Sequence, residues 1–357
     1  MKVPEAYAST GGIVYRMKKY GISENRRRTC KAVLPALLLV LLMLAGCGKS
    51  DVASLEDEET SESLQLPEQD VIESAAQSGW EKIQEWYAAG MAGEGTYEYH
   101  DAAGNLFQSN LDPLAYVNDY KRSGFSKIGD GVGDVTASYK DDKYTCVQGI
   151  DVSSHCGDID WEKVAQDGIR FTFIQIGYRG YTEGGLNIDQ YFEKNMEGAI
   201  ENGLDVGVYF FSQAVNQQEA VQEAEFVLKA LRDYAAAHDI STDKLLQLPI
   251  VYDPETIGKD NARTNDVSGS QFTSNCRAFC DRIAREGYKP AVYCNAYWQA
   301  YVLKMSELNE YSIWYADFWS YPQSPYHFEF WQYTYTGKVD GLGEGVTVDK
   351  DIWIIPK

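Results

Sequence analysis

Short apolar runs, separated by longer amphipathic stretches, dominate the chain from Gln148 onward. Two stretches, Asn216–His238 and Ser270–Gly287, have apolar residues every three or four positions, which predicts helices with one buried face. The shorter runs have the length and composition of buried strands. They are Phe171–Ile176, Val206–Phe211, Leu248–Tyr252, Ala291–Tyr293, Ile313–Ala316 and Phe328–Tyr333. Strands that alternate with helices favour parallel pairing through right-handed crossovers.

A polar side chain stands at the carboxyl end of each predicted strand. These residues are Asp151, Gln175, Ser212, Asp253 with Glu255, Asn295, Asp317, and Gln332 with Tyr333. An active site at the carboxyl ends of the strands is typical of a (β/α) barrel. The later strands follow one another too closely for full helices between them. We therefore expect an α/β fold over residues 148–357, an irregular TIM-like (β/α) barrel with a shortened second half.

The run at 248–255 ends in two carboxylates, Asp253 and Glu255, with Pro254 between them. Successive side chains of a strand point to opposite faces, so the two carboxylates project the same way, about 6–7 Å apart. Neighbouring carboxylates raise one another's pKa, which can keep one of them protonated for general acid catalysis near neutral pH. A solvated Asp-Pro-Glu turn is the alternative interpretation.

The first 47 residues have the pattern of an export signal. Basic residues at 26–28 and at Lys31 precede an apolar run, Ala32–Ala45, that is short for a membrane-spanning helix. The run ends in Leu44-Ala45-Gly46-Cys47, which resembles the lipidation signal of bacterial lipoproteins. We expect residues 1–47 to be a lipoprotein-type signal peptide that is lipidated at Cys47. An uncleaved anchor helix is the alternative.

Two further segments precede the predicted barrel. Residues 48–75 are acidic and poor in large apolar side chains, so we expect a disordered tether. Residues 76–147 are expected to be a small accessory extension of unknown role. Within it, Trp80–Ala89 has the spacing of a short helix, and Tyr97–Phe107 has the pattern of a hairpin around a turn that contains glycine.

Charge and metal-binding residue types narrow the possible functions. The formal net charge of -21 argues against binding to a nucleic acid. The four histidines are scattered, and no acidic run has the spacing of a calcium loop, so we expect neither a metal nor a cofactor. Tyrosine is abundant, at 26 residues; such rings stack on sugars but also fill cores.

Cysteine usage does not point to cysteine catalysis. Two of the seven cysteines lie in the export segment, and an odd number remains, so at least one of these is unpaired within the chain. Cys146 and Cys156 are the candidate disulfide in an oxidising location. Cys276 and Cys280 are one helical turn apart, and we expect them to be packing residues.

Several short motifs follow one another in a recognisable order. They are Gly149-Ile150-Asp151-Val152-Ser153-Ser154-His155, Asp160-Trp161, Tyr209-Phe210-Phe211, Asp253-Pro254-Glu255, Trp331-Gln332-Tyr333 and Val348-Asp349-Lys350-Asp351-Ile352. With these motifs, residues 148–357 resemble the glycoside hydrolase family 25 lysozymes. The resemblance implies an irregular β/α barrel that cleaves the β-1,4 bond between N-acetylmuramic acid and N-acetylglucosamine. Two departures from the family's pattern are Phe210, in place of a more usual histidine, and Gln175, where a charged residue is frequent.

The resemblance also implies roles for four acids. Glu255 corresponds to the general acid and Asp253 to its charged partner, while Asp151 and Asp349 match the family's other two acids. It implies retention of configuration, with either the acetamido group of the substrate or a carboxylate as the nucleophile. Candidate sugar contacts, for which core packing is the alternative at each aromatic residue, are Gln175, Tyr209, Tyr293, Asn295, Trp314, Trp331 and Tyr333.

These predictions converge on a peptidoglycan hydrolase outside the cytoplasm. We expect a monomer that acts on peptidoglycan glycan strands and is either held on the outer face of the bacterial membrane through its lipid anchor or secreted. A non-catalytic wall-binding lipoprotein and a chitin- or glucosaminide-directed glycosidase are the alternatives. The sugar at the new reducing end distinguishes a muramidase from a glucosaminidase.

Overall fold

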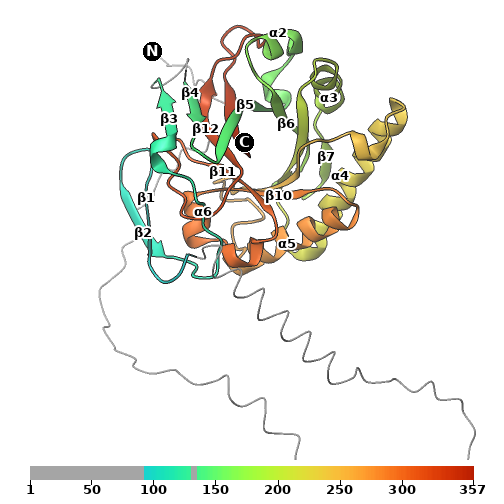
Figure 1. Cartoon of the computed structure of the whole chain (residues 1–357). Coiled ribbons are helices and arrows are strands. Elements are labelled where there is room, and N and C mark those ends of the chain that lie inside the picture. The colour runs from blue at the N-terminus through green and yellow to red at the C-terminus, as the bar shows by residue number, and fades with distance from the viewer. Residues whose placement is uncertain (1–91, 130–134) are drawn as a thin grey trace, which may run out of the picture. The chain divides into compact units, whose positions relative to one another are not determined.

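A closed barrel of eight strands forms the centre of the molecule (Figure 1). The computed structural model describes residues 92–129 and 135–357. The strand order is β5-β13-β12-β11-β10-β9-β8-β6, and β6 pairs with β5 to close the ring, with β7 (Leu186–Ile188) added beside β6. The barrel strands are β5 (Tyr144–Val152), β6 (Phe171–Arg179), β8 (Asp205–Ser212), β9 (Ile250–Pro254), β10 (Pro290–Asn295), β11 (Ser312–Ala316), β12 (Phe330–Gly337) and β13 (Val348–Pro356). The predicted fold class is confirmed.

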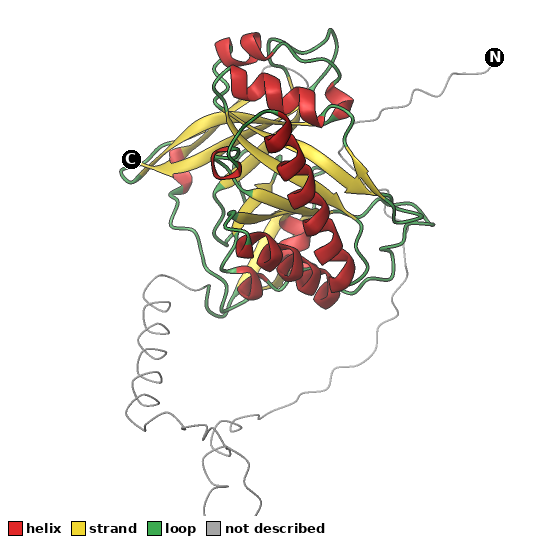
Figure 2. Cartoon of the chain, turned by 90° about the vertical axis from the view of Figure 1, so that its right-hand side faces the viewer, coloured by secondary structure: helices red, strands yellow, loops and turns green. Residues whose placement is uncertain are grey.

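The long helices cover the outside of the first half of the barrel (Figure 2). They are α3 (Phe192–Glu201), α4 (Gln217–Ala237) and α5 (Gly269–Arg285), after the short α2 (Trp161–Gln166). Both predicted helices are confirmed, and each begins at a capping side chain. Asn216 accepts from the N–H of Glu219, and Ser268 accepts from the N–H of Gln271. No helix within residues 92–357, apart from the gap at 130–134, is long and apolar enough to cross a membrane.

The second half of the barrel is irregular, as predicted. Only the short α6 (Ala296–Tyr301) and the 3-10 turn η4 (Met305–Leu308) lie between β10 and β11, and residues 317–329 contain no helix. The six predicted strands pair in parallel, whereas β13, which was not among them, is antiparallel to both β12 and β5. Because β12 and β13 are joined by a short connection of ten residues, 338–347, the chain returns as a hairpin.

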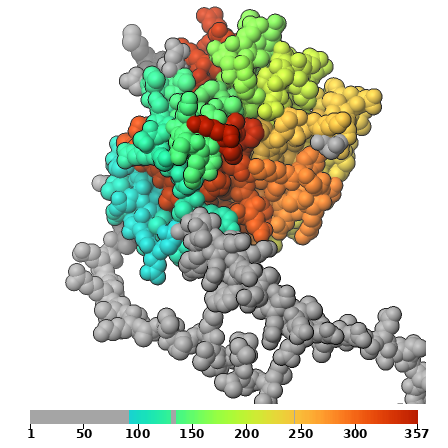
Figure 3. Space-filling model, viewed as in Figure 1, coloured from blue at the N-terminus to red at the C-terminus, as the bar shows by residue number. Residues whose placement is uncertain are grey.

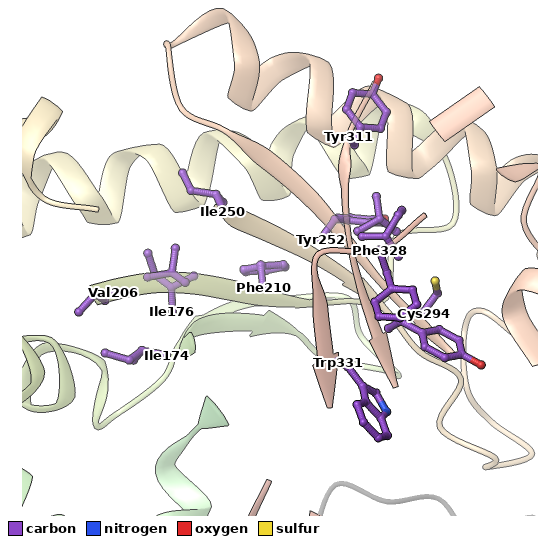
Figure 4. Packing of buried hydrophobic residues seen from close by; sticks show 14 of the residues in the cluster. Ile174, Ile176, Val206, Phe210, Ile250, Tyr252, Cys294, Tyr311, Phe328 and Trp331 are labelled. Carbon is purple, nitrogen blue, oxygen red and sulfur yellow. The ribbon is translucent and has the colours of Figure 1, made fainter. Parts of the chain in front are cut away.

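Two apolar layers lie on opposite sides of the barrel wall. The outer layer, between the strands and the helices, contains Ile174, Val206, Phe210, Ile250 and Tyr252 (Figure 4). The inner layer fills the barrel with rings and small apolar side chains: Phe171, Phe173, Tyr209, Leu248, Val251, Ala291, Tyr293, Trp314, Ala316 and Phe330. The strand period of two assigns alternate residues to the two layers. The inner layer forms an apolar floor below the carboxyl ends of the parallel strands.

The part of the extension that the structure describes contains two small hairpins. β1 (Thr96–His100) pairs with β2 (Leu106–Asn110), which confirms the predicted hairpin, and β3 (Phe125–Ile128) pairs with β4 (Thr136–Tyr139). Figure 3 shows this segment in cyan and teal on one side of the barrel, beside the red C-terminal strand. The predicted helix at 80–89, the tether at 48–75, and the signal peptide with Cys47 lie outside the described residues.

The candidate disulfide between Cys146 and Cys156 is wrong, because both thiols are free. Cys146 lies near the start of β5, and Cys156 lies in the turn η2 (Ser154–Cys156) beyond its end. Six residues of extended strand, about 20 Å, separate Cys146 from the end of β5. A disulfide needs Cα atoms within about 7 Å of each other. Cys276 and Cys280 are fully buried in the outer layer, so their predicted packing role is confirmed.

Candidate active site

Five carboxyl groups gather at the end of the barrel where the parallel strands have their carboxyl ends. Asp151 lies in β5 near its end, Asp253 lies in β9 with Glu255 directly after that strand, and Asp349 and Asp351 lie in β13. Asp349 is the register partner of Asp151. Cross-strand partners on one face have Cβ atoms about 5 Å apart. The four acids predicted from the sequence are therefore brought together, with a fifth among them.

Gln332 holds two of these acids through its side-chain amide. Its Nε2 donates to Oδ2 of Asp151 at 2.7 Å and lies 3.4 Å from Oδ2 of Asp349. Its Oε1 accepts a hydrogen bond from the hydroxyl of Tyr293 at 2.9 Å. Tyr293 also hydrogen-bonds the side chain of Glu255. One amide and one phenol thus connect acids that come from three different strands or their ends.

Trp314 forms the floor beneath the acids. Only 2% of its surface is exposed, and its Nε1 donates to Oδ1 of Asp351 at 2.8 Å. Its ring stacks on Phe173 with a centroid distance of 4.7 Å. The ring of Tyr293 meets it edge-on at 4.8 Å. An apolar floor of this kind removes water from one side of the carboxyl groups, so their charged forms are poorly solvated.

Burial consequently raises the pKa of every acid in the cluster. Burial and then the charge of Asp151 raise the pKa of Glu255 to about 7, against the hydrogen bond from Tyr293. Burial also raises the pKa of Asp151 to about 7, against hydrogen bonds from Gln332 and Asp351. Burial, followed by the charge of its neighbours, holds the pKa values of Asp253 and Asp349 well above the usual range. The cluster therefore retains protons at neutral pH.

Asp351 was not among the predicted site residues. It is 0% exposed, and its Oδ2 has no N–H or O–H donor. Its carboxyl hydrogen-bonds that of Asp151, which requires a proton on one of the two groups. Burial and the charge of Asp151 raise its pKa well above the usual range. A strand predicted over residues 348–352 would have placed Asp351 on the same face as Asp349, because residues i and i+2 of a strand share a face.

Three of the predicted sugar contacts lie with the acids on the inner face. Tyr209 and Tyr293 belong to the inner layer, each with 9% of its surface exposed. Gln175 is half-buried and is the register partner of Tyr209. Asn295 stands at the end of β10, where its Oδ1 caps α6 by accepting from the N–H of Trp298 at 3.1 Å. Trp314 shares the inner face but lies below the acids as their floor.

The expected sugar platform at Trp331 and Tyr333 is wrong. Both rings are 0% exposed and lie in the outer layer, because they flank Gln332, whose side chain points inward. Trp331 meets Phe125 of β3 edge-on at 5.6 Å, and the hydroxyl of Tyr333 donates to Oε1 of Gln148 at 3.0 Å. Trp331 therefore packs against the extension and Tyr333 bonds within the barrel wall, and neither faces a ligand.

Two other strand-end residues also serve the outer layer. The hydroxyl of Ser212 donates to Oε2 of Glu223 at 2.6 Å, and Glu223 is paired with Arg179. Asp317 accepts from the hydroxyl of Tyr315 at 2.9 Å. Among the described residues, no group of three His, Cys, Asp or Glu side chains has an arrangement that could hold a metal ion.

The sequence of the barrel matches a known family. The family model for glycosyl hydrolases family 25 matches residues 150–342, more than half of the 357 residues. The chain belongs to glycosyl hydrolase family 25. It is therefore a glycoside hydrolase, and the family 25 match includes Asp151, Asp253 and Glu255.

Individual relatives and structural neighbours cover different shares of the chain. The uncharacterized protein YegX of Escherichia coli O157:H7 is 31% identical over 251 residues, which are 68% of this chain and 80% of YegX. The chain spans 66% of YegX from Escherichia coli O6:H1. Lysozyme M1 of Streptomyces globisporus is 29% identical over 211 residues, 57% of this chain and 67% of M1. The structure of the spore cortex lytic enzyme SleM of Clostridium perfringens has a TM-score of 0.49 and 20% identity, covering 58% of this chain and 67% of SleM.

Proposed function

We propose that this protein is a lysozyme that hydrolyses peptidoglycan at the β-1,4 bond between N-acetylmuramic acid and N-acetylglucosamine. Membership of family 25 and relatives named as lysozymes support this proposal. The observation that carries it is the position of Glu255. Its half-buried carboxyl, with a pKa raised to about 7, stands beside Asp253 at the open end of a barrel with an apolar floor.

In this proposal Glu255 donates its proton to the glycosidic oxygen as the bond to the sugar breaks. Asp253 assists on the same face. Its Oδ1 is buried and has no hydrogen-bond partner, so an N–H of the substrate's acetamido group would satisfy it. Such a hydrogen bond stabilises the carboxylate of Asp253, and the charge of Asp253 then favours a proton on Glu255.

Asp253 in that position favours the acetamido oxygen as the nucleophile of a retaining reaction, with direct attack by a carboxylate as the alternative. Asp151 and Asp349 supply further negative charge near the developing oxocarbenium ion. The inner-face residues Gln175, Tyr209 and Tyr293 are the proposed sugar contacts. Asn295 lies close to them at the end of β10, with its Nδ2 left for a ligand because its Oδ1 caps α6.

The test is digestion of purified peptidoglycan by the purified protein, followed by identification of the new reducing ends. We expect the suspension to clear and the reducing ends to be muramic acid. The variant Glu255→Gln should not clear it, whereas Glu286→Gln, at a partly exposed side chain that is ion-paired with Arg282 at the end of α5, should act as the wild type does. Reducing ends of N-acetylglucosamine would show a glucosaminidase, and cleavage of chitin oligomers alone would show a chitin-directed enzyme.

We also propose that the enzyme works outside the cytoplasm as a monomer, attached to the membrane through a lipid on Cys47. A relative named as an autolytic lysozyme and the signal-like segment 1–47 support this location. Metabolic labelling with a fatty acid tests it. Label should enter the wild-type protein and be absent from Cys47→Ala, and the labelled protein should partition with the membrane.

A further inference from the structure

Lys127 of β3 joins the extension to the catalytic end of the barrel. Its half-buried ammonium group donates to three backbone carbonyl oxygens: those of Phe318 at 2.8 Å, Trp319 at 3.1 Å and Tyr333 at 2.7 Å. An ammonium group has three N–H donors, and each one finds a carbonyl here. The carbonyls belong to β12 and to the segment that follows β11. Lys127 therefore fixes these two neighbouring parts of the chain relative to each other.

A second contact holds the same segment from β1. Gln323 accepts from the N–H of His100 at 2.8 Å and donates to the carbonyl of His100 at 3.0 Å. The ring of His100 stacks on Trp319 at 5.2 Å. The buried carboxylate of Asp317 accepts from the N–H groups of Trp319 and Gln323 at 3.0 and 2.8 Å. Residues 317–323 are thus held by both hairpins of the extension.

The two parts that Lys127 joins each carry an exposed aromatic ring. Phe318 is 38% exposed and Tyr335 is 36% exposed, and their rings meet at 4.8 Å with an angle of 66°. Tyr335 lies three residues beyond Gln332, about 10 Å along the strand, and a register shift between Gln332 and Thr334 interrupts the strict alternation of faces between them. Gln332 touches Asp151, so Tyr335 lies on the strand whose Gln332 holds the acids, and Phe318 meets it from the segment after β11. Rigid rings left open beside a site are suited to bind the apolar face of a ligand.

We propose that Phe318 and Tyr335 form a glycan-binding platform next to the acids, and that Lys127 is the positioning residue that holds it. The occupant is a sugar unit of the same glycan strand, farther from the cleaved bond than the two sugars that flank it. This inference rests on the proposed function and gives the extension a part in substrate binding. Continuity along β12 from Gln332 to Tyr335 favours the substrate over a separate partner.

The test compares variants by the KM and kcat for soluble peptidoglycan fragments of increasing length, and by their Kd for the same fragments in a Glu255→Gln background. Phe318→Ala and Tyr335→Ala should each weaken binding of long fragments by about 3–10-fold. The kcat and the binding of the shortest fragments should change little. Lys127→Met should reproduce this pattern, and Lys127→Arg should restore part of the binding because a guanidinium also donates several N–H bonds.

Lys143→Met is the matched control. Lys143 is also a lysine of the extension, but its Nζ bonds the exposed carboxylate of Asp119 at 2.6 Å, so binding should not change. Wild-type affinity in both ring variants would overturn the platform even if Lys127→Met failed to fold. An equal loss for long and short fragments would also overturn it. A wild-type protein that hydrolyses no peptidoglycan would instead overturn the proposed function, and the platform with it.

Discussion

The two carboxylate pairs on β9 and β13 have the same spacing but lie at different depths. Each pair is i and i+2 on a strand, so each projects to one face. β9 runs toward the open end of the barrel, and its second acid, Glu255, is half-buried at that end. β13 runs the opposite way, so its first acid, Asp349, is half-buried while its second, Asp351, is 0% exposed. Strand direction decides which acid of each pair meets the solvent.

The two pairs can contact different groups because their acids lie at different depths in the barrel. The acid at the open end of β9 can reach a substrate and is hydrogen-bonded to Tyr293. The deep acid of β13 can reach only the protein, where it meets Trp314 and Asp151. We therefore expect Glu255 to transfer a proton in the reaction and Asp351 to hold its neighbours in place. The following predictions separate these two roles.

The largest effect should come from Glu255, the half-buried acid directly after β9. Glu255→Gln removes the proton donor while keeping the shape of the side chain, and general acid catalysis contributes about 10²–10⁴-fold to a rate. Asp349→Asn, at the open end of β13, should lower kcat by a smaller factor, because it removes charge and no proton donor. Initial rates on peptidoglycan fragments measure both. Equal losses in the two variants would contradict the assignment of the donor to β9.

The deep acid should tolerate an amide but not an apolar side chain. Asp351→Asn keeps an acceptor for the indole of Trp314 and offers a donor to Asp151, so activity should remain within about tenfold of the wild type. Asp351→Leu leaves the buried indole N–H unpaired and should lower the free energy of unfolding by about 1–3 kcal/mol. Urea unfolding and rate measurements on both variants test this. A Leu variant as stable as the Asn variant would show that the indole bond contributes nothing.

The sequence predicts the β9 pair better than the β13 pair, for a physical reason. Asp253 and Glu255 follow an apolar run, so local alternation is enough to place them on one face. Asp351 gains its depth only from antiparallel pairing with β5, a contact between segments about 200 residues apart. The same limit explains Trp331 and Tyr333, whose rings were expected in the groove although only Gln332 between them points there. Local patterns predict the spacing of side chains along a strand, whereas the closure of the barrel decides which side chains point into it.

The raised pKa values also predict how stability depends on pH. Burial raises the pKa of Glu255 from 4.5 to about 7, so the folded state binds its proton more tightly than the unfolded state does. The resulting contribution of Glu255 to the free energy of unfolding is complete below about pH 4 and is lost as the pH rises to 7. For one such group we expect a loss of roughly 1–3 kcal/mol over that window. The urea midpoints at pH 5 and pH 7.5 should differ less in Glu255→Gln than in the wild type. The same difference in both proteins would contradict the prediction.

The smallest effect should come from Tyr293, which hydrogen-bonds the half-buried Glu255. Its hydrogen bond lowers the pKa of Glu255 against the effect of burial, and it also orients Gln332. Tyr293→Phe should therefore raise the pKa of Glu255 further and move the alkaline limb of the rate profile to higher pH. Because one neutral hydrogen bond is worth about 1 kcal/mol, the limb should move by less than about one pH unit.

The matched control for this last variant is Tyr311→Phe. The hydroxyl of Tyr311 bonds Asp281 on the outside of the barrel, so its removal should leave the alkaline limb in place. A limb that moves to lower pH in Tyr293→Phe would mean that the phenol stabilises the protonated acid. A limb that does not move at all would mean that another acid controls it, and the proton donor would then have to be sought at Asp253, the other acid of the β9 pair.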